Sequence, residues 1–164
     1  GPLTRLDHAA NAAVLLASVP PAGVLAATLR IAARHPIPFL KANLTWSLYH
    51  IVGTPELCCE ALFSKNTFDG KAKDYFARIQ DESYLGFLDM MIFALPRPKR
   101  VAMPMLVLGA ANDMIFTPGE VQATARAYNT AAEIFSDMAH DMMLEPGWQA
   151  AADSIIAWLK ERGL

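Results

Sequence analysis

Two residues in the last third of the chain could carry out acid–base chemistry together. His140 lies among small and apolar residues in the stretch DMAHDMMLEPGW, and Asp113 directly follows an apolar run in LGAAND. A carboxylate that accepts a hydrogen bond from an imidazole fixes the ring's tautomer and stabilises the imidazolium that forms when the ring takes a proton. Asp137 and Asp141 flank His140, but adjacent chain positions rarely orient an imidazole well. Asp113 is therefore the predicted partner of His140.

Each residue also has a structural interpretation, as a packed or surface histidine and as a turn or capping aspartate. The chemical interpretation requires that the fold bring them together. Short apolar runs predict three strands, over residues 11–20, 103–113 and 131–138, and such runs are typical of a parallel sheet buried on both faces. Ligands of open α/β sheets bind beyond the carboxyl ends of the strands, where Asp113 and His140 would both lie.

Helical patterns follow the second and third predicted strands, over residues 117–130 and 145–164. Thr117, Pro118 and Glu120 have the spacing of a capping box with proline in the first turn. The alternation of strand and helix predicts right-handed crossovers in a parallel sheet.

The middle of the chain is helical instead, and its apolar patterns are broken by prolines and glycines. A crossover needs only about a dozen residues, so the surplus predicts an inserted helical cap over the site. The expected organisation is a first core segment over 1–21, the cap over 22–97 and a second core segment over 98–164.

The segment from MPMLVLGAAND to AAADSIIAWLKERG, residues 103–163, resembles the C-terminal part of α/β-hydrolase-fold proteins of the lysophospholipase-like or esterase-like kind. VLLASVPPAGVL resembles the sixth strand of that fold and the start of its cap. The resemblance implies an α/β fold with about three parallel strands, crossover helices and an inserted helical cap. It also implies that Asp113 is the acid and His140 the base of a catalytic triad, in which the nucleophile precedes both in the chain.

The nucleophile of that family is missing from the sequence. Its motif is G-x-S-x-G on a sharp turn, and no serine here has glycine two residues away on both sides. The serines are Ser18, Ser47, Ser64, Ser83, Ser136 and Ser154. Cys58 and Cys59 fit no better, and the oxyanion-hole loop is absent. We expect a serine or aspartate nucleophile outside these 164 residues, so that the chain alone is inactive.

Apolar side chains of the predicted cap and sheet edge are candidates for binding an apolar small-molecule substrate, with ordinary core packing as the alternative. Methionine adapts to irregular apolar shapes, which suits an acyl chain or another bulky group. The candidates are Phe39, Trp46, Tyr49, Met90, Met91, Met114, Phe116 and Met142.

Composition excludes several other classes of protein. The chain has 164 residues, a net charge of −2 and no basic run longer than RPKR, so a nucleic-acid partner is not expected. No apolar run approaches the roughly 20 residues of a membrane span, and no secretory signal opens the chain. The two cysteines are adjacent, which fits a reducing, cytoplasmic location. No metal-ligand spacing, phosphate loop or dinucleotide motif is present, so no cofactor is expected.

Two hypotheses follow. The chain is part of a hydrolase that cleaves an ester or similar acyl bond, or it is a non-catalytic binding or dimerising module of the same fold. With 54% hydrophobic residues and only three strands, it would expose a sheet edge. We expect the N-terminal half of the fold or a second copy to cover that edge. The opening GPL resembles the remnant of a cleaved tag, so Gly1 and Pro2 need not be natural.

Overall fold

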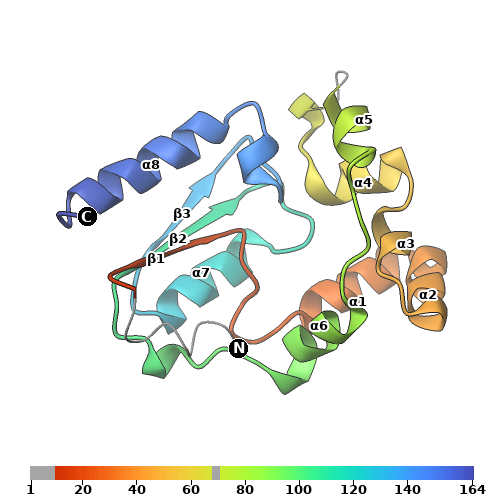
Figure 1. The fold of residues 1–164 in the computed structure, drawn as a ribbon, viewed down its shortest axis with the longest axis horizontal. Helices are drawn as coiled ribbons and strands as arrows, with labels where there is room; N and C mark the ends of the chain where they lie inside the picture. Colours follow the sequence, from red (N-terminus) through yellow and green to blue (C-terminus); the bar gives the residue numbers. More distant parts are fainter. Residues whose placement is uncertain (1–9, 68–70) are drawn as a thin grey trace.

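The computed structural model describes residues 10–67 and 71–164, and its core is a sheet of three parallel strands (Figure 1). The strands are β1 (Ala13–Leu16), β2 (Met105–Ala110) and β3 (Ala132–Phe135), in the order β1-β2-β3. Leu15 lies opposite Val107, and Gly109 opposite Ile134. All three predicted strands are confirmed. Gly1 and Pro2 lie outside the described residues.

Helices α7 (Pro118–Ala127) and α8 (Trp148–Lys160) pack on opposite faces of the sheet. Successive side chains of a strand point to opposite faces, and the core divides accordingly. Val107 packs with Val121 and Ala125 of α7. Leu106 and Leu108 pack with Ala151 of α8. Both predicted crossover helices are therefore present, and the central strand β2 is buried on both faces.

Helix α7 begins as the sequence predicts. The Thr117 hydroxyl accepts a hydrogen bond from the Glu120 amide, and the Glu120 carboxylate accepts one from the Thr117 amide. This capping box satisfies two amides that the first turn of a helix leaves without partners. It fixes the point at which the chain leaves the loop that carries Asp113.

Short helices occupy most of the chain between β1 and β2, as the proline and glycine spacing predicts. Pro36 and Pro55 each begin one of them, a position that needs no amide donor. The elements are α1 (Leu25–Arg34), α2 (Pro36–Thr45), α3 (Tyr49–Val52), α4 (Pro55–Leu62), η2 (Lys65–Thr67), α5 (Lys71–Phe76), α6 (Tyr84–Leu88), the π-helical η3 (Asp89–Phe93) and η4 (Pro98–Arg100).

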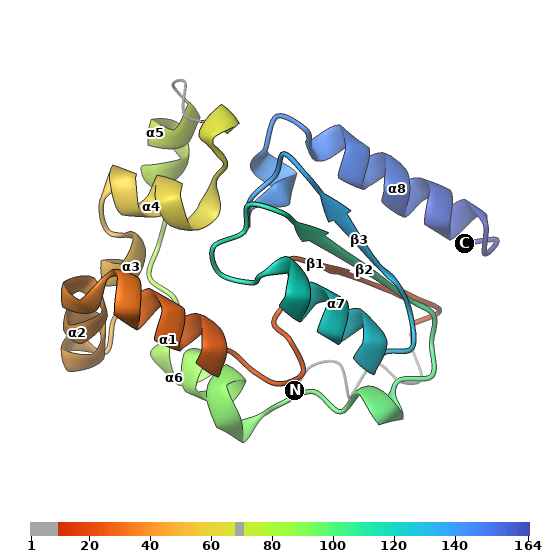
Figure 2. The ribbon, with the colours of Figure 1, turned by 180° about the vertical axis from the view of Figure 1, so that it is seen from behind.

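Helices α1 to α5 lie together on the side of the molecule toward which the strands point (Figures 1 and 2). Val24 and Ala27, at the start of α1, pack into the core on the α7 side of the sheet. The helical segment is thus attached to the core and stands beside the carboxyl ends of the strands. The exact limits of a separate cap, at residues 21 and 97, stay a prediction.

Each outer strand has one partner in the part of the chain that the structure describes. β1 and β3 each pair only with β2 there, which leaves the far edges of both strands without ladder hydrogen bonds. None of the helices within residues 10–67 and 71–164 is both long and apolar enough to cross a membrane.

Close contact between β2 and α7 depends on Gly109. A Cβ atom at this position would lie 2.7 Å from both γ-methyl groups of Val121. We expect Gly109→Ala to lower the free energy of unfolding by about 1–3 kcal/mol, because the stiff valine side chain has little freedom to move away. Chemical denaturation would measure the loss.

Val121→Ala provides the matched control, because it removes the methyl groups that Gly109→Ala would strike. The double variant should lose less stability than the sum of the two single variants, by about 1 kcal/mol or more. Strictly additive losses would show that the cost of Gly109→Ala arises elsewhere.

Candidate active site

Asp113 lies three residues beyond β2 with its carboxylate fully buried. Its Oδ1 accepts hydrogen bonds from the backbone amides of Ile115, at 2.7 Å, and Phe116, at 3.0 Å. A side chain that bonds amides two and three residues ahead closes a turn, so the local sequence itself sets the orientation of the carboxylate. The other oxygen, Oδ2, is left to face a different partner.

That partner is His140, whose Nδ1 lies 2.9 Å from Asp113 Oδ2. The edge of the Phe116 ring packs against the imidazole with centroids 5.5 Å apart. Since a carboxylate accepts, Nδ1 carries the proton in this bond, and Nε2 of the neutral ring is then an acceptor. No residue in the described part of the chain forms a hydrogen bond with Nε2, and the imidazole lines a cavity. The ring can therefore accept a proton from a group in that cavity.

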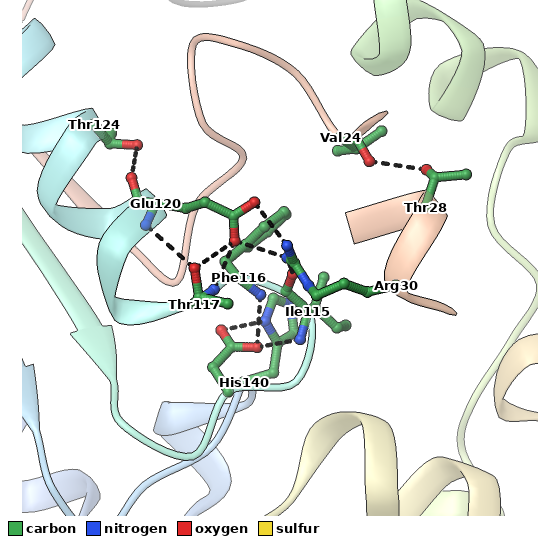
Figure 3. Close-up of polar contacts among 10 residues, drawn as sticks. Val24, Thr28, Arg30, Ile115, Phe116, Thr117, Glu120, Thr124 and His140 are labelled. Atoms are coloured by element: carbon green, nitrogen blue, oxygen red, sulfur yellow. Dashed lines mark hydrogen bonds and ion pairs between the residues drawn. The ribbon is translucent and has the colours of Figure 1, made fainter. Parts of the chain in front are cut away.

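The Asp113 loop is also tied to the helical segment (Figure 3). Arg30, on α1, donates to the Ile115 carbonyl at 2.5 Å and to both carboxylate oxygens of Glu120, at 3.1 and 2.7 Å. Burial raises the pKa of Glu120, but hydrogen bonds from Arg30 and Thr117 outweigh it and leave the pKa below its ordinary value. The ion pair thus holds α1 against the residue whose amide orients Asp113.

Asp141 is a second carboxyl group beside the imidazole. Its pKa is raised above the ordinary aspartate value, mainly by burial and further by the negative charges of Asp113 and Glu145, while His140 acts to lower it. Its backbone amide donates to the Leu62 carbonyl at 2.9 Å. The side chain lines the same cavity as His140, so the site combines two carboxyl groups in different environments.

The cavity has a volume of about 1500 Å³, which exceeds the roughly 300–1,000 Å³ of ordinary small-molecule pockets. It runs from the end of β1 and from His140 along the inner sides of α1, α2, α3 and α6. Most of its lining is apolar. Its polar lining residues include Ser18, Thr28 and Asn43, and the acidic side chains of Glu82 and Asp89 also line it.

Three of the eight candidate substrate-binding residues line this cavity, namely Phe39, Met90 and Phe116. The other five are not part of this lining, and a role in substrate binding stays a prediction for all eight. Met91 is partly buried and packs against the core cluster on the α7 side of the sheet, and Met142 is fully buried on the α8 side. Trp46 is 63% exposed and packs against Tyr84. Tyr49 and Met114 are partly buried outside the lining. Apolar type alone does not separate a cavity wall from a core, because apolar side chains line both.

Ser18 is a lining residue that the sequence analysis did not select. It follows the end of β1, the same sheet edge that places Asp113 and His140, so the strand-end rule could have found it. The preceding residue, Ala17, has a φ of +43°, in the left-handed region that L residues rarely adopt.

The two buried cysteines are poorly suited to act as nucleophiles. Burial, with smaller effects of Cys59 and Asp141, raises the pKa of Cys58 to about 11, so its thiol is protonated near neutral pH and a poor nucleophile. Burial also raises the pKa of Cys59. Among the described residues, no group of three or more His, Cys, Asp or Glu is placed to hold a metal ion.

Comparison with known proteins defines the class of fold. No protein-family model matches the sequence, and no curated protein matches it. A solved structure, described as the non-heme bromoperoxidase BpoC from Mycobacterium tuberculosis H37Rv, matches with a TM-score of 0.56 and 19% sequence identity. The match covers 94% of this chain and 59% of that one. The chain therefore has a mixed α/β fold similar to an α/β hydrolase, and it spans less than two thirds of its neighbour's length.

The buried turn at Asp113 gives a test of the site's geometry. Asp113→Ala removes the acceptor of two amides and of the His140 Nδ1–H, and we expect a loss of about 2 kcal/mol in the free energy of unfolding. Asp113→Asn keeps an oxygen for the two amides and should lose clearly less. Denaturant titration of the two variants checks this, and equal losses would contradict the bonding described.

The raised pKa of Asp141 predicts a pH dependence of stability. The folded chain holds this proton more tightly than the unfolded chain, so stability falls as pH rises from the ordinary value of 3.8 to the raised one. Asp141→Asn removes the ionisation. We expect the free energy of unfolding of the variant, relative to the wild type, to increase with pH through this range and then level off. A difference independent of pH would refute the assignment to Asp141.

Proposed function

We propose that this chain supplies the acid and the base of the catalytic triad of an α/β-fold hydrolase, which cleaves an ester or similar acyl bond. Asp113 holds His140 in the tautomer with the proton on Nδ1. Nε2 of His140 takes the proton from the nucleophile during attack and returns it to the leaving group. The observation that carries the proposal is the 2.9 Å contact between Nδ1 and the buried carboxylate, at the wall of a large cavity.

The nucleophile in this proposal lies outside the 164 residues. None of the serines has the flanking glycines of a nucleophile turn, and the pKa of Cys58 is raised to about 11. Among residues 10–67 and 71–164 the outer edge of β1 has no strand partner. A further parallel strand would add there, and a turn at its carboxyl end would bring a serine or aspartate to the same edge as His140. The proposed partner is thus the N-terminal half of the fold.

The proposed substrate is apolar. Phe39, Met90 and Phe116 lie on the wall of the same cavity as His140, and a lining in which apolar residues predominate favours an acyl chain or another bulky hydrocarbon group. The polar side chains of Thr28 and Asn43 would then contact the polar end or a bound water.

The alternative is a binding module without catalysis, in which a second copy of the chain covers the β1 edge. The large apolar cavity supports ligand binding equally well. Sedimentation of the purified chain, together with a fatty-acid binding assay and an activity assay, distinguishes the two. A stable dimer that binds a fatty acid favours the module. A monomer that gains activity when the N-terminal half is added favours the hydrolase.

An alkyl fluorophosphonate probe, which labels activated serines, tests the hydrolase. Intact-mass spectrometry should show no label on the 164-residue chain. A longer polypeptide that includes these residues and a nucleophile turn should take one label. We expect His140→Ala in it to slow labelling by about 10³-fold or more. Glu133→Gln, which alters a carboxylate bonded to Ser154 away from the site, is the matched control.

Other results would each contradict part of the proposal. A label at Ser18 of the isolated chain would place the nucleophile within it. A longer polypeptide that takes no label would exclude a serine nucleophile. Labelling that continues unchanged in the His140→Ala variant would remove His140 from the mechanism.

A further inference from the structure

Glu145 lies five residues after His140 and is 1% exposed. Its carboxylate accepts four hydrogen bonds from three residues. Oε1 accepts from the backbone amides of Ser64, at 2.5 Å, and Ala139, at 3.2 Å. Oε2 accepts from the hydroxyls of Ser64 and Thr67, both at 2.6 Å. A buried carboxylate with this number of donors is fixed in position by its surroundings.

These bonds join two parts of the chain that are far apart in sequence. Ser64 and Thr67 lie between α4 and α5 in the helical segment, whereas Ala139 directly precedes His140. The residue after His140 is held to the same segment, because the Asp141 amide donates to the Leu62 carbonyl. The backbone on both sides of His140 is therefore bonded to one network that centres on Glu145 and the segment 62–67.

These hydrogen bonds on both sides of His140 restrict where its imidazole can lie. The loop after β3 has no regular structure until η5 (Met142–Leu144). Its backbone is held by the bonds from the Asn112 amide to the Met138 carbonyl, at 3.0 Å, and from the Met142 amide to the His140 carbonyl, at 2.9 Å. The Glu145 network adds bonds at the two residues that adjoin His140, Ala139 and Asp141. The hydrogen bond from Nδ1 to Asp113 fixes one ring atom, and the position of the Cα atom determines where Nε2 points. Small displacements of catalytic groups reduce rates strongly.

We propose that Glu145 is the positioning residue of His140, which acts through Ala139 and the segment 62–67 to hold the imidazole against Asp113. The proposal rests on the proposed function, since it concerns the base of that triad. It assigns the role to the geometry of the carboxylate and not to its charge. It also makes the helical segment part of the acid–base machinery, because Ser64 and Thr67 supply the donors.

The test uses the 164-residue chain and the NMR signal of the His140 Nδ1–H proton, which a hydrogen bond to a carboxylate protects from exchange with water. His140→Gln assigns the signal by its loss, and Asp113→Asn shows that it depends on the pair. In Glu145→Ala we expect exchange of this proton to be about tenfold faster or more, or the signal to be lost, because Ala139 and Ser64 lose their common acceptor.

Glu145→Gln separates geometry from charge. Its carboxamide oxygen can accept from both amides, and its NH₂ group can donate to the hydroxyls of Ser64 and Thr67, which also act as acceptors. We expect nearly wild-type exchange in this variant. The double variant Ser64→Ala/Thr67→Ala, which keeps the two amide bonds, should show an intermediate increase and serves as the test if Glu145→Ala does not fold.

Val107→Ala controls for general destabilisation, since Val107 is buried in β2 and belongs to the core cluster on the α7 side, which includes Phe116 but no residue of the loop 136–141. It should lower the thermal midpoint and leave the His140 signal unchanged. If Glu145→Ala and the double variant exchange like the wild type, or if Val107→Ala and Glu145→Ala speed exchange equally, the positioning role is refuted. Glu145→Gln behaving like Glu145→Ala would overturn the geometric role in favour of charge. A wild-type chain with no signal dependent on Asp113 would refute the pairing itself, and with it the proposed function.

Discussion

The arrangement of the candidate site depends on one buried carboxylate. Asp113 turns one oxygen toward the amides of Ile115 and Phe116 and the other toward Nδ1 of His140. A carboxylate out of contact with water is costly unless its lone pairs are occupied, so the turn and the imidazole are both needed to keep it there. Because the turn lies just beyond the end of β2, the sheet determines where Asp113 lies relative to His140.

Around this carboxylate the helical segment forms two separate attachments. Arg30 bonds the Ile115 carbonyl and the Glu120 side chain, which secures the Asp113 loop to α1. Ser64 bonds the buried Glu145, which secures the loop of His140 to the segment after α4. Loops that carry catalytic groups depend on such support, since their own backbone does not fix them. The helices beside the strand ends thus do more than cover a cavity.

Two features of the described part of the chain are accessible from outside: the cavity beside His140 and the outer edge of β1. The cavity beside His140 has a volume of about 1500 Å³, and β1 has one edge without a ladder partner among the described residues. The neighbour described as a bromoperoxidase shares the fold over 94% of this chain, and the match covers 59% of its own length. The fold is common to both proteins, while the residues that react are set by the site.

Local chemistry in the sequence was enough to predict the three strands, the capping box at Thr117 and Glu120, and the pairing of Asp113 with His140. Apolar runs, cap spacing and the strand-end rule all depend on a few neighbouring residues, so they can be recognised in the sequence alone. The contacts that support the site could not be predicted from the sequence, because Glu145 is 81 residues from Ser64 and Arg30 is 90 residues from Glu120. The sequence also could not separate Met90, in the cavity wall, from Met91, which packs against the core, because adjacent apolar residues differ only in the direction they face. Only the tertiary structure decides which distant donors meet a buried carboxylate, since burial removes water as the competing partner and leaves the fold to supply every hydrogen bond.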